Sequence, residues 1–114
     1  MGKLRGKSAT ALLAVAGRQW KHQKYVLRLF VAGMTPRSQE AVRAVTTVCE
    51  RNLAGRYHLD VIDLYQQPAL AKSEQIFAVP TLVRKLPVPV RLFIGNMADK
   101  RKILTGLDII PADA

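Results

Sequence analysis

The side chains of this chain that could carry out covalent chemistry are few, and Cys49 is the only cysteine among them. A single cysteine excludes an internal disulfide and dithiol exchange, because both need a second thiol in the same chain. Cys49 falls on the apolar side of a predicted helix, where a thiol behaves as a small hydrophobic group. The sequence therefore predicts an inert, buried thiol and no cysteine nucleophile.

The other candidate catalytic groups lack the spacing that chemistry needs. His22 and His58 lie far apart in the sequence, and no pair of metal-ligating residues has a recognised spacing. No nucleophile elbow and no glycine-rich phosphate loop is present, although a serine, histidine and aspartate brought together only by the fold stay open at this stage. We expect His58 to project from a strand. The default prediction is an interaction module that is no enzyme and holds no metal and no cofactor.

The elements that carry these residues begin with a strand and a sharp turn. Residues 25–32 are apolar except for Arg28, as in a central strand that is covered on both faces. Gly33 permits the turn, Thr35 can cap the helix that follows, and Pro36 suits the first helical position.

A helix and a second strand follow the turn. Apolar residues recur at three- and four-residue spacing between Ala41 and Leu53, which gives the helix one face to lay on a sheet, and Gly55 is a suitable end. Residues 57–63 alternate at first and end apolar, as a strand does. The helical crossover predicts that the two strands are parallel with a right-handed connection.

The C-terminal half has a less regular pattern. Residues 69–76 can form a short helix, and Pro80 must lie at a strand start or on an edge strand, since proline cannot donate a ladder hydrogen bond. A further strand is predicted over 90–94 and a helix over 98–106. Residues 107–110 fit either a helical face or an extended segment.

This order of elements is that of the thioredoxin fold, an α/β architecture. A redox member of that fold carries Cys-x-x-Cys in the turn after its first strand, where a helix N-terminus stabilises the thiolate. In this chain the turn has the sequence Gly33-Met34-Thr35-Pro36-Arg37. The redox position of the predicted fold is therefore empty.

The formal net charge of +10 is unevenly distributed. Residues 1–24 hold six lysines and arginines and no acid, so the rest of the chain carries only +4. No RNA-binding aromatic pattern, zinc-finger spacing or helix-turn-helix pattern accompanies the charge. We interpret residues 1–24 as a flexible or partly helical basic arm, which argues against nucleic acid as a partner.

A single domain is predicted over residues 25–110, followed by a short tail over 111–114. The apolar run over residues 9–16 is too short to be a good match to a secretory signal. No apolar run approaches the roughly 20 residues that a membrane span needs, and the lone cysteine fits a reducing compartment. We expect a soluble, cytoplasmic protein that does not contact membranes.

Motifs along about residues 25–110 resemble the KaiB family of circadian-clock proteins. The matching segments follow one another in order and nearly without gaps: Tyr25-Val26-Leu27, Val31-Ala32-Gly33, Thr35-Pro36, Val61-Ile62-Asp63, Pro68 with Leu70-Ala71, Pro80-Thr81-Leu82, Leu86-Pro87, Pro89-Val90-Arg91, Ile94-Gly95 and Gly106-Leu107-Asp108. Each segment alone is a weak match, whereas the combination is specific.

The resemblance implies a non-enzymatic regulator that binds the first ATPase ring of a KaiC-type hexamer and modulates its phosphorylation or output signalling. In cyanobacterial clocks such a protein also helps to capture KaiA and to displace or activate histidine kinases. The resemblance further implies homodimers or homotetramers. Their C-terminal half can adopt either a KaiB-specific βαββααβ arrangement or a thioredoxin-like one that binds KaiC.

The resemblance also assigns roles to five residues. It implies that Arg84, Lys85 and Arg91 are exposed basic residues that contact the partner. It implies that Gly106 and Asp108 set the balance between the two folds. From helix propensity and the helix dipole we expect Gly106→Ala and Asp108→Arg to favour the helical, thioredoxin-like state.

Departures from the family pattern limit the set of partners. Asp60 replaces a typically basic residue on the strand that in the family faces KaiA, and this argues against KaiA binding. One alternative function is a thioredoxin-like sensory or interaction domain of a histidine-kinase signalling system. A basic nucleic-acid-binding protein is the third.

Overall fold

The computed structural model describes residues 24–109. These residues form, in chain order, β1 (Tyr25–Val31), α2 (Pro36–Asn52), β2 (Tyr57–Asp63), α3 (Ala69–Ser73), β3 (Thr81–Leu86), β4 (Arg91–Ile94) and α4 (Lys100–Gly106). The predicted arm over residues 1–24, apart from Lys24, and the predicted tail over 111–114 lie outside the described residues.

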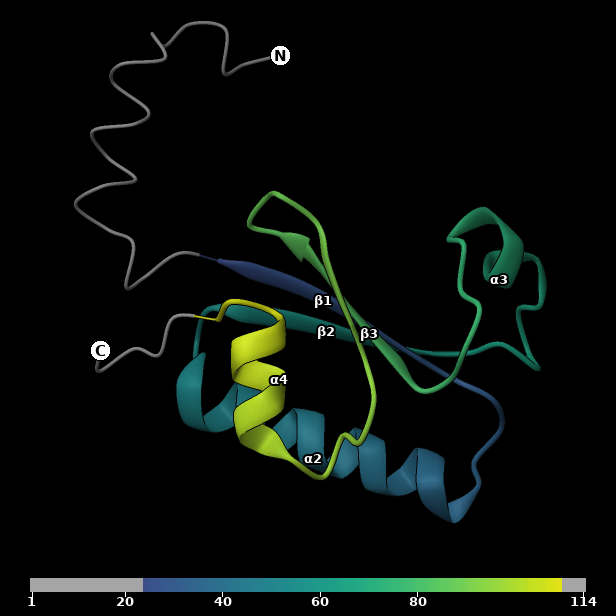
Figure 1. The fold of residues 1–114 in the computed structure, drawn as a ribbon, viewed down its shortest axis with the longest axis horizontal. Helices are drawn as coiled ribbons and strands as arrows, with labels where there is room; N and C mark the ends of the chain where they lie inside the picture. The colour runs from purple at the N-terminus through teal and green to yellow at the C-terminus, as the bar shows by residue number, and fades with distance from the viewer. Residues whose placement is uncertain (1–23, 110–114) are drawn as a thin grey trace, which may run out of the picture.

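The four strands form one sheet in the order β2-β1-β3-β4. β1 pairs with β2 in parallel, whereas the pairs β1 with β3 and β3 with β4 are antiparallel. α2 and α4 cover one face of the sheet, and α3 lies apart from them near one end (Figure 1). The predicted thioredoxin-like α/β fold with a central β1 is confirmed, and the C-terminal half has the thioredoxin-like arrangement of the two that were expected.

The turn between β1 and α2 forms as the sequence predicts. Gly33 has a φ of 73°, in the left-handed region that glycine reaches without strain. Its backbone N–H donates to Asp63 Oδ1 at 2.8 Å, which ties the turn to the end of β2. The Thr35 hydroxyl accepts a hydrogen bond from Ser38 N at 3.1 Å, and Pro36 is the first residue of α2. The predicted roles of Gly33, Thr35 and Pro36 are confirmed.

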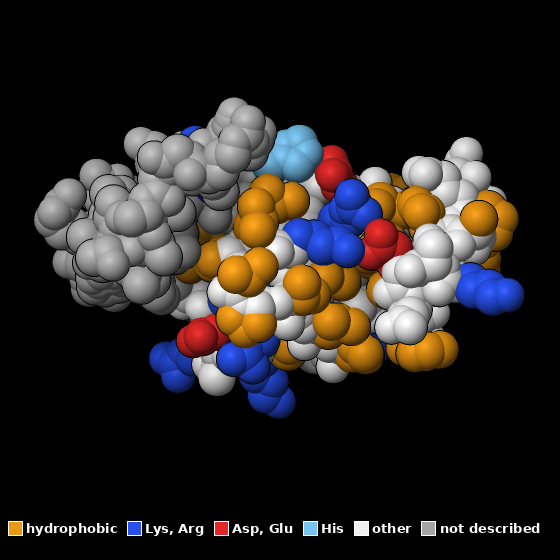
Figure 2. Space-filling view, turned by 90° about the horizontal axis from the view of Figure 1, so that it is seen from above, with side chains coloured by type: hydrophobic (Ala, Val, Ile, Leu, Met, Phe, Trp, Pro, Cys, Tyr) orange, Lys and Arg blue, Asp and Glu red, His pale blue; other side chains and the backbone are white. Residues whose placement is uncertain are grey.

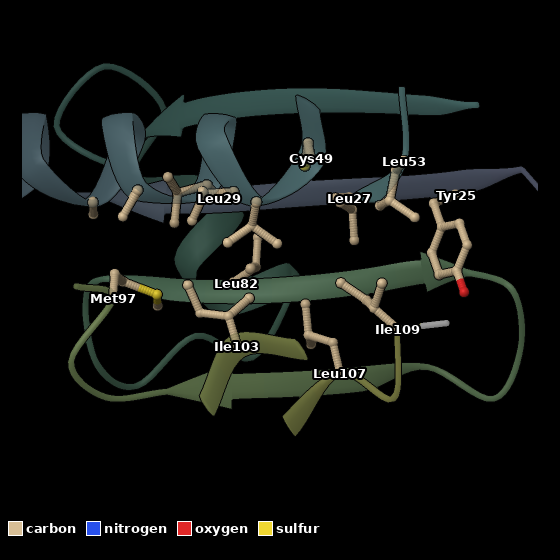
Figure 3. Close-up of a cluster of buried hydrophobic side chains, with 14 of the residues drawn as sticks. Tyr25, Leu27, Leu29, Cys49, Leu53, Leu82, Met97, Ile103, Leu107 and Ile109 are labelled. Carbon is tan, nitrogen blue, oxygen red and sulfur yellow. The ribbon is translucent and has the colours of Figure 1, made fainter. Parts of the chain in front are cut away.

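The main hydrophobic core lies between the sheet and the helices α2 and α4 (Figure 3). Every second residue of β1 points into this core and meets residues of α2 and α4. The fully buried members of the core include Leu27, Leu29, Leu82, Val45, Ile103 and Leu107. Because α4 and the residues after it supply part of this core, the segment that the sequence left ambiguous is folded onto the sheet.

A smaller cluster lies on the opposite face of the sheet. Phe30, Ile62, Ile76 and Val83 are buried there beneath α3 and the loop that follows it. α3 ends at Ser73, earlier than the predicted 69–76, and Gln75 then has a φ of 58°, which a continuing helix cannot contain. The short helix covers only part of this face.

Pro80 lies immediately before β3, and its peptide bond with Val79 is cis. The prediction that Pro80 occupies a strand start is therefore confirmed, and the central strand β3 loses no ladder hydrogen bond to it. Among residues 24–109, no helix is both long enough and apolar enough to cross a bilayer.

Candidate protein-binding surface

The only cysteine is remote from the turn in which a redox member of this fold carries its thiols. Cys49 lies in α2 with 1% of its surface exposed. Burial, with a smaller contribution from the neighbouring Glu50 charge, raises the pKa of Cys49 to about 12. The thiol is therefore protonated at neutral pH, and the prediction of a buried, unreactive cysteine is supported.

The described residues hold no candidate metal centre. No three side chains of His, Cys, Asp or Glu gather within residues 24–109 in a way that could hold a metal ion. His58 projects from β2, as expected, and its Nε2 lies 2.9 Å from Asp60 Oδ1 at the surface.

The sheet face that carries α3 exposes a group of apolar side chains. Leu92 and Ile94 of β4 lie opposite Val83 and Thr81 in the register, which places both on the α3 side of the sheet. They are 49% and 56% exposed, the neighbouring Val90 is 51% exposed, and Phe77 in the loop after α3 is 92% exposed. We name Phe77, Val90, Leu92 and Ile94 the open-face patch.

Figure 2 shows hydrophobic side chains gathered on one face of the molecule around a small group of charged ones. A hollow of about 310 Å³ runs between the loop after α3 and β4, and all four residues of the open-face patch line it. A contiguous apolar group of this kind on a domain surface marks an interaction site more often than chance exposure does.

An ion-pair group forms the polar wall of this hollow. Glu74 accepts hydrogen bonds from Lys85 Nζ at 2.6 Å and from Arg28 Nη1 at 3.0 Å. The hydrogen bond from Lys85, joined by the charges of Lys85 and Arg28, holds the pKa of Glu74 below its usual value against the opposing effect of burial. These pairs fasten the end of α3 to β1 and β3.

Arg84, expected to be an exposed partner contact, is buried, with only 3% of its surface exposed. Its guanidinium donates to the carbonyl oxygens of Leu107 at 2.7 Å, Asp108 at 3.1 Å and Pro89 at 2.7 Å. The expectation of an exposed Arg84 is therefore wrong. The side chain joins β3, the turn before β4 and the end of α4.

The three basic residues that the resemblance singled out do not form one surface. Lys85 is half-buried against Glu74 on the α3 side, because consecutive strand residues point to opposite faces. Arg91 lies opposite Arg84 in the register and so faces the α4 side, where it is exposed. Of the three, only Arg91 presents an exposed charge without a described carboxylate partner.

The end of α4 forms a Schellman cap. Ile109 N donates to Leu104 O at 2.9 Å and Asp108 N donates to Thr105 O at 3.2 Å, the two hydrogen bonds that define this motif. Asp108 has a φ of 54°, so the left-handed residue of the segment is Asp108.

Gly106 is the last residue of α4 and lies against an aromatic ring. A Cβ atom added at Gly106 would lie 2.6 Å from Phe93 Cδ1, well inside van der Waals contact. Phe93 packs against the main core, so its ring could not move away freely. This contact reverses the effect expected from helix propensity: the Cβ atom of Gly106→Ala would destabilise the thioredoxin-like arrangement and not favour it.

Sequence reasoning missed the open-face patch. The signal for part of it is present as the alternation of Val90, Leu92 and Ile94 with a period of two. The sequence pattern does not tell whether another element covers that side of β4, and the predicted helix over 69–76 is longer than the observed α3.

Fold and surface together define a class: thioredoxin-like domains without the redox dithiol, in which an apolar sheet face is left open. The KaiB domain model matches residues 28–109. The chain is 46% identical over 86 residues to the circadian clock oscillator protein KaiB of Gloeothece citriformis, covering 75% of this chain and 81% of that protein. It is 40% identical over 88 residues to the circadian clock protein KaiB3 of Synechocystis sp., covering 77% and 86%. The chain belongs to the KaiB family of circadian clock proteins.

Solved structures agree with this assignment. The N-terminal domain of SasA from Synechococcus elongatus aligns with a TM-score of 0.62 at 27% identity, covering 75% of this chain and 85% of that domain. The thioredoxin Deadhead of Drosophila melanogaster aligns with a TM-score of 0.59 at 17% identity, covering 81% and 86%, and it shows the shared fold alone.

Proposed function

We propose that this chain is a non-enzymatic regulator that binds a KaiC-type hexameric ATPase and modulates its phosphorylation or its output signalling. Membership of a family of circadian clock proteins supports a regulatory role in timing. The observation that carries the binding proposal is the open-face patch, an apolar surface that includes the exposed aromatic side chain of Phe77.

The proposal assigns different roles to the residues that the resemblance named. Arg91 is exposed on the α4 side of β4, opposite to the open-face patch, but β4 is an edge strand, so a partner on the patch can contact Arg91 around that edge and Arg91 contributes to the salt dependence of binding. Lys85 borders the hollow and acts together with Glu74. Arg84, Gly106 and Asp108 act indirectly, because they stabilise or destabilise the thioredoxin-like arrangement that presents the patch.

In this proposal the regulator is cytoplasmic. It has the thioredoxin-like arrangement when it binds the ring. A second arrangement of the C-terminal half, with homodimers or homotetramers, is part of the same proposal. Asp60 on β2 continues to argue against KaiA as a partner.

Sizing the purified chain with and without a KaiC-type hexamer and ATP tests this function. We expect the chain to co-elute with the ring and to change the ring's rate of ATP hydrolysis or phosphorylation. The double variant of Lys85→Ser and Arg91→Ser should bind more weakly, with a smaller dependence on salt. Absence of co-elution at micromolar concentrations of both proteins would overturn the proposal.

A second candidate function is that of an interaction domain in a histidine-kinase signalling system. The structural likeness to the SasA N-terminal domain favours including it. Binding of the chain to a purified KaiC-type ring and, in a separate experiment, to a purified histidine kinase of the same host discriminates the two candidate functions. Binding to the kinase alone would select the second function.

A further inference from the structure

β4 is an edge strand of the sheet that the described residues form. The strand order is β2-β1-β3-β4, so β4 pairs with β3 on one side, and no strand of residues 24–109 pairs with its other side. In an antiparallel pair, every second residue of the edge strand directs its N–H and C=O away from its neighbour. β4 therefore presents backbone donors and acceptors to which a further strand can bind.

The α3 side of β4 is apolar. Its side chains on this side, Leu92 and Ile94, are about half exposed and line the hollow of the open-face patch. The charged groups in the lining of that hollow, Glu74 and Lys85, are bound to each other at 2.6 Å. A side chain that points to this side from a strand beside β4 therefore meets apolar groups, together with charges that are already paired.

The α4 side of β4 is positively charged. Arg91 and Phe93 point to this side, and a second hollow of about 470 Å³ lies there, with Phe93, Arg101 and Lys102 in its lining. Neither Arg91 nor Arg101 forms an ion pair with another described residue. Lys102 Nζ lies 4.0 Å from Asp99 Oδ2, but both side chains are exposed, so this pair contributes little. A side chain that points to this side therefore meets free cations.

We propose that β4 binds an extended segment of a protein partner, in which apolar and acidic residues alternate, as a further strand of the sheet. Successive residues of a strand point to opposite sides of the sheet. The apolar side chains of the segment then lie against Leu92 and Ile94. Its carboxylates lie on the other side, within reach of Arg91 and Arg101, because opposite residues of neighbouring strands have Cβ atoms about 5 Å apart.

The positive charge selects an acidic segment over a second copy of this chain. If the β4 strands of two copies paired, each would bring the same cations, Arg91, Arg101 and Lys102, to one shared edge. Like charges that meet across neighbouring strands are destabilising. An acidic segment brings the opposite charge, and the net positive charge of residues 25–114 adds to the attraction.

In the proposed function, on which this site rests, the segment belongs to the KaiC-type ring. Arg91 lies on the α4 side of β4, whereas the open-face patch lies on the α3 side. A strand bound along β4 contacts both, because its side chains alternate between the two sides. Strand addition therefore lets a single partner contact the patch and Arg91 together.

Amide hydrogen exchange of the full chain with a synthetic peptide tests the strand addition without any ATPase. The probe is a short acetylated peptide in which glutamate and valine alternate. A control peptide has the same composition, with all glutamates before all valines. The alternating peptide should slow exchange at every second amide of β4, by about tenfold when the peptide is at about ten times its Kd. The control peptide should leave the exchange of β4 unchanged.

A charge reversal tests the α4 side of the site. The double variant of Arg91→Glu and Arg101→Glu should lose protection by the glutamate-valine peptide and gain it from the corresponding lysine-valine peptide. The matched control, Arg43→Glu with Arg51→Glu, makes the same change of net charge at exposed positions of α2. This control should keep the preference of the parent for the glutamate-valine peptide.

Three results would overturn the proposal. The first is equal protection of β4 by the alternating and the control peptide, which would show attraction by charge alone. The second is no protection by either peptide. The third is exchange of β4 that slows with the concentration of the chain itself, because a second copy would then occupy the edge. Since no ATPase is present, each of these failures leaves the proposed function standing.

Discussion

Replacing Arg84 should weaken the thioredoxin-like arrangement far more than replacing any other basic residue of β3 or β4. The informative change is Arg84→Met, which keeps the apolar length of the side chain and removes every donor. The carbonyl oxygens of Leu107, Asp108 and Pro89 then lose the guanidinium that they share. Arg84→Lys keeps the charge but offers a single compact donor group, which cannot reproduce the fork.

The expected change in the free energy of unfolding follows from two terms that destabilise the variant and one that offsets them. Each charge-assisted hydrogen bond contributes about 1.5–3 kcal/mol, and a buried carbonyl left without a donor costs about 1–3 kcal/mol. Against this, burying the guanidinium is itself costly, and its Nε atom is buried without a hydrogen-bond partner. We expect a net loss of about 3 kcal/mol for Arg84→Met and a smaller loss for Arg84→Lys. That is a large part of the roughly 5–15 kcal/mol by which a domain of this size is stable.

Urea unfolding and amide exchange of α4 measure the effect, with Arg91→Met as the matched control. Arg91 lies opposite Arg84 on the next strand and is exposed, so its replacement should change the free energy of unfolding by about 0.5 kcal/mol or less. In Arg84→Met the amides near the end of α4 should exchange faster than those of β1. Equal unfolding midpoints for the two variants would refute the role given to Arg84.

Three further changes test the account at other positions. Gly106→Ala should destabilise the thioredoxin-like arrangement by about 1 kcal/mol, because the new Cβ meets the Phe93 ring. In a double-mutant cycle of thermal unfolding, adding Phe93→Leu should recover the stability lost in Gly106→Ala. Asp108→Gly should raise the melting temperature, with a gain of about 1 kcal/mol, since glycine adopts the left-handed conformation of this cap without strain; an unchanged melting temperature would contradict the cap. The lowered folded-state pKa of Glu74 means that its ion pairs stabilise the fold above the ordinary glutamate pKa of about 4.3 and lose that effect as pH falls through the folded-state value. Glu74→Gln should therefore cost about 1 kcal/mol at pH 7 and much less at pH 3 in urea unfolding, and an equal cost at both pH values would count against these pairs.

The first half of the fold was predictable because its signals are local. The apolar run over residues 25–32, the turn at Gly33, the cap at Thr35 and the proline at Pro36 each specify conformation through neighbouring residues. That the turn carries no Cys-x-x-Cys can be read in the same way, from the residue types of one short segment.

The surface was predictable only in part, because it depends on which way strand residues point and where elements end. Arg84 and Lys85 are adjacent in sequence, yet only the strand register decides that the first is buried and the second borders the hollow. α3 ends at Ser73, before Gln75 with its φ of 58°, and no simple sequence pattern marks this end. The contact between Gly106 and Phe93 joins two elements and carries no sequence pattern.

The affinity of a KaiC-type ring for the Phe77→Ser variant tests the central claim most directly. Phe77 is 92% exposed, so its replacement should leave the free energy of unfolding unchanged within about 0.5 kcal/mol. If the open-face patch binds the ring, loss of this aromatic side chain should raise the Kd by about tenfold or more, whereas Val61→Ser on the other face should leave it unchanged. Equal affinities of the parent, Phe77→Ser and Val61→Ser for the ring would contradict the assignment of this surface.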